Sequence, residues 1–263
     1  MGRLPAGNQT IDERIRTAVS LIRGASSVVV MTGAGISTES GIPDYRGPGG
    51  VWETQTPPTI GDYLDNIETR RGFWRRRLTD YPSLAAREPN AGHRALVELE
   101  RRGVLLAIIT QNIDGLHQKA GNSPERVIEL HGSAHRVLCV DCGRFWPSDE
   151  VQERLRNGED DPRCSFCGGI LRSGTVLFGE SLPKAEIEKA VAVSNACDVM
   201  LVVGSSLVVN PAAQLPQIAR RRGASLIMIN RTGTPLDHLA DVHILSEAGP
   251  TLSDVISRLD TGR

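Results

Sequence analysis

The segment that begins at Val28 places a short apolar run directly before a glycine-rich turn. Val28–Met31 has the length of a fully buried strand, and the glycines of Gly33-Ala34-Gly35 permit a tight turn and a close approach of the backbone to a ligand. A helix is expected from Ile36, with Ser37 or Thr38 as its N-cap. A strand that leads through such a turn into a helix presents bare N–H groups at one point, which suits a pyrophosphate.

This turn departs from the usual dinucleotide fingerprint, G-x-G-x-x-G. Gly33 and Gly35 fit the fingerprint, but Thr38 stands where the third glycine belongs. Many strand-to-helix turns need glycine for steric reasons only. From this segment alone, phosphate binding and a purely structural turn are both open.

Strand-like and helix-like patterns alternate along the rest of the chain. Further buried strands are expected over residues 104–110, 127–130, 174–178, 198–203, 225–229 and 242–245. Helical periodicity covers residues 10–23, 60–81, 91–102, 183–195 and 250–259, and the second of these is expected to break near residues 71–72. This alternation predicts the α/β class, with a parallel sheet that carries helices on both faces.

Polar residues follow three of the expected strands. In an open parallel sheet, ligands collect at the C-terminal ends of the strands, so these residues are the first candidates for a site. They are Gln111-Asn112-Ile113-Asp114, His131 and Gly204-Ser205-Ser206. A histidine there can serve as a proton acceptor near neutral pH, although a strand histidine is more often a core residue.

Four of the five cysteines form two C-x-x-C pairs, Cys139 with Cys142 and Cys164 with Cys167. Two such pairs joined by a hairpin form a zinc ribbon, and a glycine follows each pair where the turn must relax. Because four thiolates leave no open coordination position, we expect a structural zinc without a chemical role. Cys197 stands alone and is expected to be a buried apolar residue.

The overall charge favours no polyanionic partner. Lys and Arg number 30 against 31 Asp and Glu, for a net charge of −1, so neither nucleic acid nor an anionic membrane is expected as a partner. A local cluster, Arg70, Arg71, Arg75, Arg76 and Arg77, is interpreted as a solvated helix face. The N-terminal residues contain no signal-peptide core and no run is long enough to span a membrane, which indicates a cytoplasmic protein.

Taken in order, six motifs, with the cysteine pairs among them, resemble the sirtuins, the Sir2-type NAD-dependent protein-lysine deacylases. The motifs are Gly33–Ser37, Gly41–Arg46, Thr110–Asp114, His131-Gly132, the four cysteines and Gly204–Leu207. The resemblance implies a single catalytic domain over residues 1–263. Its Rossmann-like core would span 10–47, 90–136 and 173–260, with a helical insertion at 48–89 and the zinc ribbon at 137–172.

The resemblance also assigns site residues. NAD would contact Gly33, Ala34, Gly35, Ile36, Ser37, Asp44, Tyr45, Arg46, Gln111, Asn112, Ile113, Asp114, His131, Gly204, Ser205, Ser206, Asn230 and Ala248. His131 would be the general base, with Asn112 and Asp114 as further catalytic residues. The acyl-lysine peptide would pair as an added strand with Val176, Leu177, Phe178, Gly179 and Glu180.

The implied reaction removes an acyl group from lysine. The amide oxygen would attack C1′ of the nicotinamide ribose as nicotinamide leaves, and a base would then help a ribose hydroxyl attack the resulting imidate. The products would be free lysine, nicotinamide and O-acyl-ADP-ribose. Two alternatives are a protein mono-ADP-ribosyltransferase that uses the same pocket and a non-catalytic NAD or ADP-ribose sensor.

Two local features resemble the branch that contains the mitochondrial human sirtuin 4. They are the run Gly41–Arg46, with Tyr45 where many deacetylases have Phe, and the run Phe73–Arg77. The desuccinylase branch binds an acyl carboxylate through a Tyr-x-x-Arg pair, and the corresponding positions here are Trp74 and Arg77. Arg77 could hold an acidic acyl group, but we expect it to face solvent with its neighbours. Residues 46–58, with Trp52, are expected to form either a lid or a packed surface loop.

Overall fold

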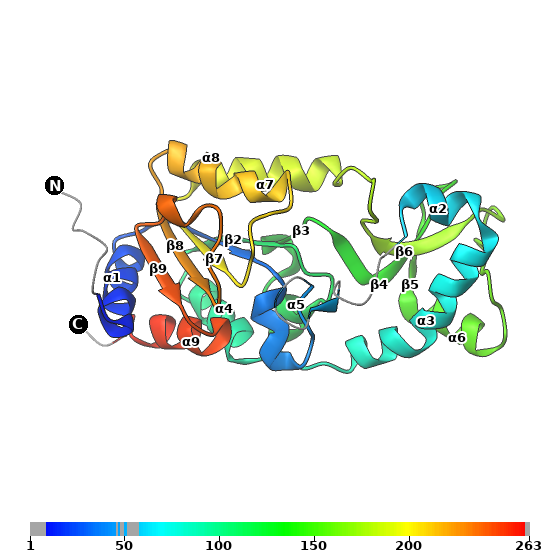
Figure 1. Cartoon of the computed structure of the whole chain (residues 1–263), viewed down its shortest axis with the longest axis horizontal. Helices are drawn as coiled ribbons and strands as arrows, with labels where there is room; N and C mark the ends of the chain where they lie inside the picture. The colour runs from blue at the N-terminus through cyan, green and yellow to red at the C-terminus, as the bar shows by residue number, and fades with distance from the viewer. Residues whose placement is uncertain (1–8, 46, 48–49, 52–57, 261–263) are drawn as a thin grey trace.

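A computed structural model describes residues 9–45, 47, 50–51 and 58–260. Arg46 and Trp52, with most of the expected lid, lie outside these residues. A six-stranded sheet forms the larger part, with strand order β3-β2-β1-β7-β8-β9 (Figure 1). Its strands are β1 (Val28–Thr32), β2 (Leu105–Thr110), β3 (Val127–Glu129), β7 (Val199–Val203), β8 (Ser225–Asn230) and β9 (Val242–Leu245). Every neighbouring pair is parallel, as the alternation of patterns predicted.

Helices cover both faces of this sheet, because each strand of the sheet sends alternate side chains to opposite sides. Val28 and Val30 pack with α1 (Ile11–Arg23), α4 (Ala91–Arg101) and α9 (Ala248–Ser257). Val29 and Met31 pack on the other face with α7 (Lys184–Ala196) and α8 (Leu215–Arg221). The short helix α5 (Leu116–Ala120) follows β2. No helix within the described residues is long and apolar enough to span a membrane.

A smaller, antiparallel sheet lies at the end of the molecule away from the termini (Figure 1). Its strands are β4 (Gly132–Cys139), β5 (Phe145–Pro147) and β6 (Leu171–Thr175). Helices α2 (Ile60–Asp65), α3 (Ile67–Ala85) and α6 (Ser148–Arg156) surround it. Trp74 of α3 is fully buried against Val137 and Leu171, so the helical segment and the ribbon share one core.

Two element boundaries differ from the sequence prediction. The break in the helical segment falls at Asn66, because the Asn66 side chain accepts hydrogen bonds from the backbone N–H groups of Glu68 and Thr69 and so begins a new helix. The strand expected over 174–178 ends at Thr175, the last residue that pairs with β4. The apolar residues that follow lie outside the sheet.

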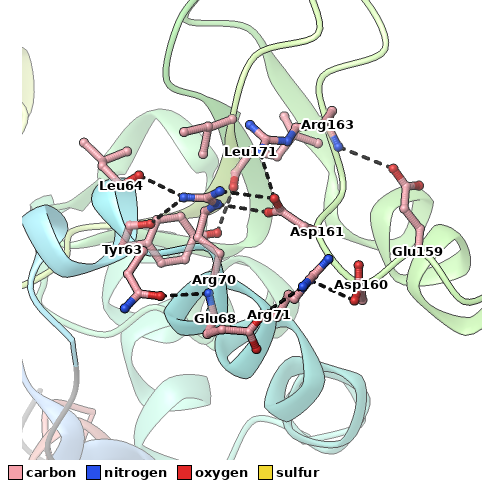
Figure 2. A network of polar contacts seen from close by, with 12 residues as sticks. Tyr63, Leu64, Glu68, Arg70, Arg71, Glu159, Asp160, Asp161, Arg163 and Leu171 are labelled. Atoms are coloured by element: carbon pink, nitrogen blue, oxygen red, sulfur yellow. Dashed lines mark hydrogen bonds and ion pairs between the residues drawn. The ribbon is translucent and has the colours of Figure 1, made fainter.

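The arginine cluster is not a solvated helix face. Arg75 and Arg76 are exposed, but Arg70 and Arg77 are only 5% and 7% exposed. Arg70 forms an ion pair with Asp161 (Figure 2), and Arg77 donates to the carbonyl of Ala134 and the hydroxyl of Ser148. The helical pattern could not predict which arginines are buried, because the groups that accept their hydrogen bonds lie far away in the sequence.

Candidate active site

Most of the site residues predicted from the sequence line a single cavity of about 750 Å³. It lies beyond the carboxyl ends of β1, β2, β7 and β8, the place where α/β sheets bind ligands. The predicted residues that line it are Gly33, Ala34, Gly35, Asp44, Tyr45, Gln111, Asn112, Ile113, His131, Val176, Leu177, Phe178, Gly179, Glu180, Gly204, Ser205, Ser206, Asn230 and Ala248.

Three predicted residues lie behind the wall of the cavity. The Ile36 side chain is fully buried in the core beneath the sheet. Ser37 Oγ donates to Asp114 Oδ2 at 2.7 Å, and Asn112 Nδ2 donates to Ser37 Oγ at 3.0 Å. Ser37 and Asp114 therefore hold the Asn112 amide in place from behind. Arg46 lies outside the described residues.

The glycine turn is not the expected helix start. Residues Ala34–Ser40 form a 3₁₀ helix with Gly33 at its N-cap, and the Ser37 and Thr38 hydroxyls bond elsewhere. The N–H groups of Gly33 and Gly35 donate to the carbonyls of Val203 and Gly204, so they are not bare. A Cβ on Gly35 would lie 2.6 Å from Gly204 Cα. The glycines thus bring the ends of β1 and β7 into contact.

His131 connects β3 to β4 and faces the cavity. Its Nδ1 lies 2.8 Å from the carbonyl oxygen of Gln111, and because a carbonyl only accepts, Nδ1 carries the proton. In the neutral ring Nε2 therefore bears the lone pair that a general base needs. The carbonyl of His131 accepts from the N–H of Val176 at 2.9 Å, which joins His131 to the segment Val176–Glu180.

The segment Val176–Glu180 is held on two sides. Phe178 forms a parallel bridge with Thr59, and its carbonyl accepts from Ile60 N at 2.9 Å. Glu180 forms a largely buried ion pair of 2.8 Å with Arg172. The segment is irregular, and it turns at Gly179 (φ 85°), where the N–H of Glu180 donates to the carbonyl of Leu177 at 3.1 Å.

Two features shape the electrostatics of the cavity. Burial raises the pKa of the Tyr45 phenol and the Asp114 carboxylate raises it further, so the phenol stays neutral. Asp44 forms an ion pair of 3.2 Å with Arg231.

The Asn230 side-chain amide nitrogen is buried and has no partner among the described residues, although Asn230 lines the cavity. A ligand with hydroxyl acceptors, such as a ribose, fits this nitrogen.

Sequence reasoning missed part of the cavity wall. The additional residues are Gly47, Thr175, Ser181, Leu182, Ile187, Val209, Asn210, Pro211, Arg231 and Thr232. Most of them directly flank a predicted motif, so extending each motif by a few residues would have found them. Ile187 could not be found in this way, because it lies on α7 in a pattern that is typical of core packing.

The four paired cysteines converge on one point. Their sulfur atoms all lie within 4.8 Å of one another, with Cys139 to Cys167 at 3.5 Å and Cys142 to Cys164 at 3.8 Å. Tetrahedral zinc with bonds of about 2.3 Å separates its sulfurs by about 3.8 Å, so the donor set fits zinc. Gly143 and Gly168, with φ of 70° and 76°, relax the two turns as predicted. Zinc there would hold the ribbon together.

The sheet, the cavity and the cysteine cluster define a nucleotide-binding α/β protein with a small metal-binding lobe. The sequence model of the Sir2 family matches residues 33–211, and the chain belongs to this family.

Its relatives cover nearly the whole chain. It is 46% identical to "NAD-dependent protein deacetylase 2" of Streptomyces coelicolor, over 90% of this chain and 99% of that protein. It is 42% identical to "NAD-dependent protein deacylase 2" of Archaeoglobus fulgidus, over 95% and 97%. A solved complex of Sir2 with a p53 peptide and NAD⁺ superposes with a TM-score of 0.85 at 35% identity, covering 94% of this chain and 99% of that one. These bacterial and archaeal relatives give no support to the sirtuin 4 branch.

Proposed function

We propose that this protein is an NAD-dependent protein-lysine deacylase. The observation that carries the proposal is that His131, the segment Gln111–Ile113 and the turns that begin at Gly33 and Gly204 face one cavity. The names of the relatives and the peptide and NAD⁺ in the Sir2 complex support it. NAD would be consumed as a co-substrate and would supply the electrophilic ribose carbon.

In this proposal each part of the cavity has one task. The glycine turns and Asn230 bind the phosphates and the adenosine ribose, and Asn112 orients the nicotinamide end. His131 accepts a proton at Nε2, since its Nδ1–H is held by the Gln111 carbonyl. The backbone of Val176–Glu180 takes up the acyl-lysine peptide as an added strand, a mode that recognises main chain more than side chains.

The preferred acyl group is proposed to be small and uncharged, such as acetyl. Arg77 is the residue that would have held an acyl carboxylate, but it is buried in the small lobe, where its Nη2 donates to the neutral oxygens of Ala134 and Ser148. It is not one of the described residues that line the cavity. Arg77 therefore offers no partner for an acidic acyl group, and a preference for lipoyl, biotinyl or acidic acyl groups is the competing hypothesis.

The test is a mass-spectrometric panel of one lysine peptide carrying acetyl, succinyl, glutaryl, biotinyl or lipoyl groups, with and without NAD. We expect NAD-dependent loss of acetyl with formation of O-acetyl-ADP-ribose, fastest in the panel. His131→Ala should lose this activity by at least about 100-fold, the range for removal of a general base, while NAD still binds. The exposed His238→Ala is the matched control.

Three outcomes would contradict the proposal. ADP-ribose on a protein without loss of any acyl group would favour the transferase. NAD binding without any turnover would favour the sensor. Full activity of His131→Ala would remove this residue as the base.

A further inference from the structure

A chain of buried polar groups lies behind the segment Gln111–Asp114. Thr32 ends β1 and Thr110 ends β2, and the two residues are partners in the parallel register. Thr32 Oγ1 donates to Thr110 Oγ1 at 2.9 Å, and the N–H of Asn112 donates to the same Thr110 oxygen at 3.1 Å. The Thr32 and Thr110 side chains are buried. The Thr110 hydroxyl therefore contacts the backbone of Asn112, and the Thr32 hydroxyl supports it from the neighbouring strand.

The chain continues to a histidine on α5. His117 is buried, and its Nε2 lies 2.9 Å from Thr32 Oγ1. Because Thr32 uses its single proton toward Thr110, it must accept the proton of His117 Nε2. Burial lowers the pKa of His117 well below its ordinary value, so the ring is neutral and its Nδ1 is an acceptor.

A second buried histidine completes the arrangement. The His93 ring on α4 lies 5.0 Å from the His117 ring, centroid to centroid. His93 Nδ1 accepts from the N–H of Asn90, so the neutral ring carries its proton on Nε2. His93 Nε2 and His117 Nδ1 have no hydrogen-bond partner among the described residues. One is a donor and the other an acceptor, but they do not bond to each other, so the hydrogen-bonded chain ends at His117 and His93 only packs against it.

We propose that Thr32, Thr110 and His117 are positioning residues for the nicotinamide-binding segment Gln111–Asp114. They hold the backbone of Asn112, while Ser37 and Asp114 hold its side chain. The inference rests on the proposed function for the task of Asn112. Removal of the Thr110 hydroxyl would leave the Asn112 N–H buried without a partner, which the segment can relieve only by moving.

The test compares Thr110→Val, which removes the hydroxyl at nearly constant volume, with Thr110→Ser, which keeps it. Thr251→Val, a buried threonine of α9 outside this chain of contacts, is the matched control. We expect Thr110→Val to lower kcat/KM for NAD about tenfold, the range for a buried donor left unpaired. The Kd for ADP-ribose, which lacks nicotinamide, should stay within about twofold. Thr110→Ser should recover most of the loss.

A second measurement needs no activity. Hydrogen–deuterium exchange of residues 111–115 in the free protein should be faster in Thr110→Val than in wild type, Thr110→Ser or Thr251→Val. Unchanged exchange and unchanged NAD kinetics in Thr110→Val would overturn the inference, as would an equal loss of ADP-ribose and NAD binding. An inactive wild type with faster exchange in Thr110→Val would instead refute the proposed function and leave the positioning role in place.

Discussion

At the residue scale, Gly35 shows that a motif can be recognised for one reason and required for another. The sequence suggested bare N–H groups for a phosphate, but the Gly35 N–H donates to the Gly204 carbonyl at 2.9 Å. What Gly35 provides is the absence of a side chain at the contact between the two turns. Sequence alone could not show this, because Gly204 lies in the turn after β7, which is distant in the chain.

Gly35→Ala is therefore expected to separate the two turns. The new Cβ would meet Gly204 Cα at 2.6 Å and Gly204 O at 2.9 Å, and neither backbone atom can rotate away. We expect a loss of about 1–3 kcal/mol in the free energy of unfolding, together with weaker NAD binding. Urea denaturation and calorimetric titration with NAD measure the two effects.

The matched control is Gly24→Ala at the end of α1. Gly24 has a φ of −81°, and a Cβ there would have its nearest neighbours at 3.7 Å. Its stability should change by no more than about 1 kcal/mol. Equal effects of the two substitutions would show that the contact with Gly204 carries no special strain.

At the scale of elements, a network of ion pairs joins the helical segment to the ribbon (Figure 2). Arg70 of α3 binds Asp161 through two N–H groups, at 3.0 and 3.2 Å, and donates also to the carbonyls of Tyr63 and Leu64 in α2. The Tyr63 hydroxyl donates to the carbonyl of Leu171 in β6 at 2.8 Å. Two segments that are separate in sequence are thus one packed unit.

Asp161→Asn should disrupt this unit. The Arg70 and Asp161 side chains are 6% and 9% exposed, so the substitution leaves a buried guanidinium without its counter-charge, at a cost of about 3 kcal/mol or more. The neighbouring pair Arg71–Asp160 is a natural control, because its side chains are 35% and 59% exposed. Asp160→Asn should cost less than about 1 kcal/mol. Equal losses in urea denaturation would contradict the view that burial makes the difference.

At the scale of the whole molecule, the features that could be predicted were those that depend on patterns of neighbouring residues in the sequence. Alternating apolar runs predicted the parallel sheet and its two helical layers, and the C-x-x-C spacing predicted the cysteine cluster. Features that depend on distant partners were not predictable. The burial of Arg77 depends on acceptors that are 57 and 71 residues away, and the end of β6 depends on where β4 stops pairing with it.

The buried histidines give the whole protein an expected acid sensitivity. Burial lowers the pKa of His93 from 6.5 to about 4 against the opposing effect of Asp114, and Arg94 lowers it further. Burial also lowers the pKa of His117. Between pH 6.5 and about 4 the unfolded chain binds protons at these residues and the folded chain does not. The stability that these two neutral histidines contribute is therefore fully present above pH 6.5, and it is lost as the pH falls toward 4.

For His93 alone, the loss between pH 7.5 and pH 5.0 amounts to about 2 kcal/mol in the free energy of unfolding. Urea denaturation at the two pH values, with zinc present in excess, measures it. His93→Gln removes the titrating group and should show a smaller pH dependence than wild type by about that amount. The exposed His238→Gln should keep the wild-type dependence. If the stabilities of His93→Gln and His238→Gln depend on pH alike, water reaches the ring of His93. The buried polar groups behind Asn112 are then more open to solvent than the contacts of Thr32 and His117 imply.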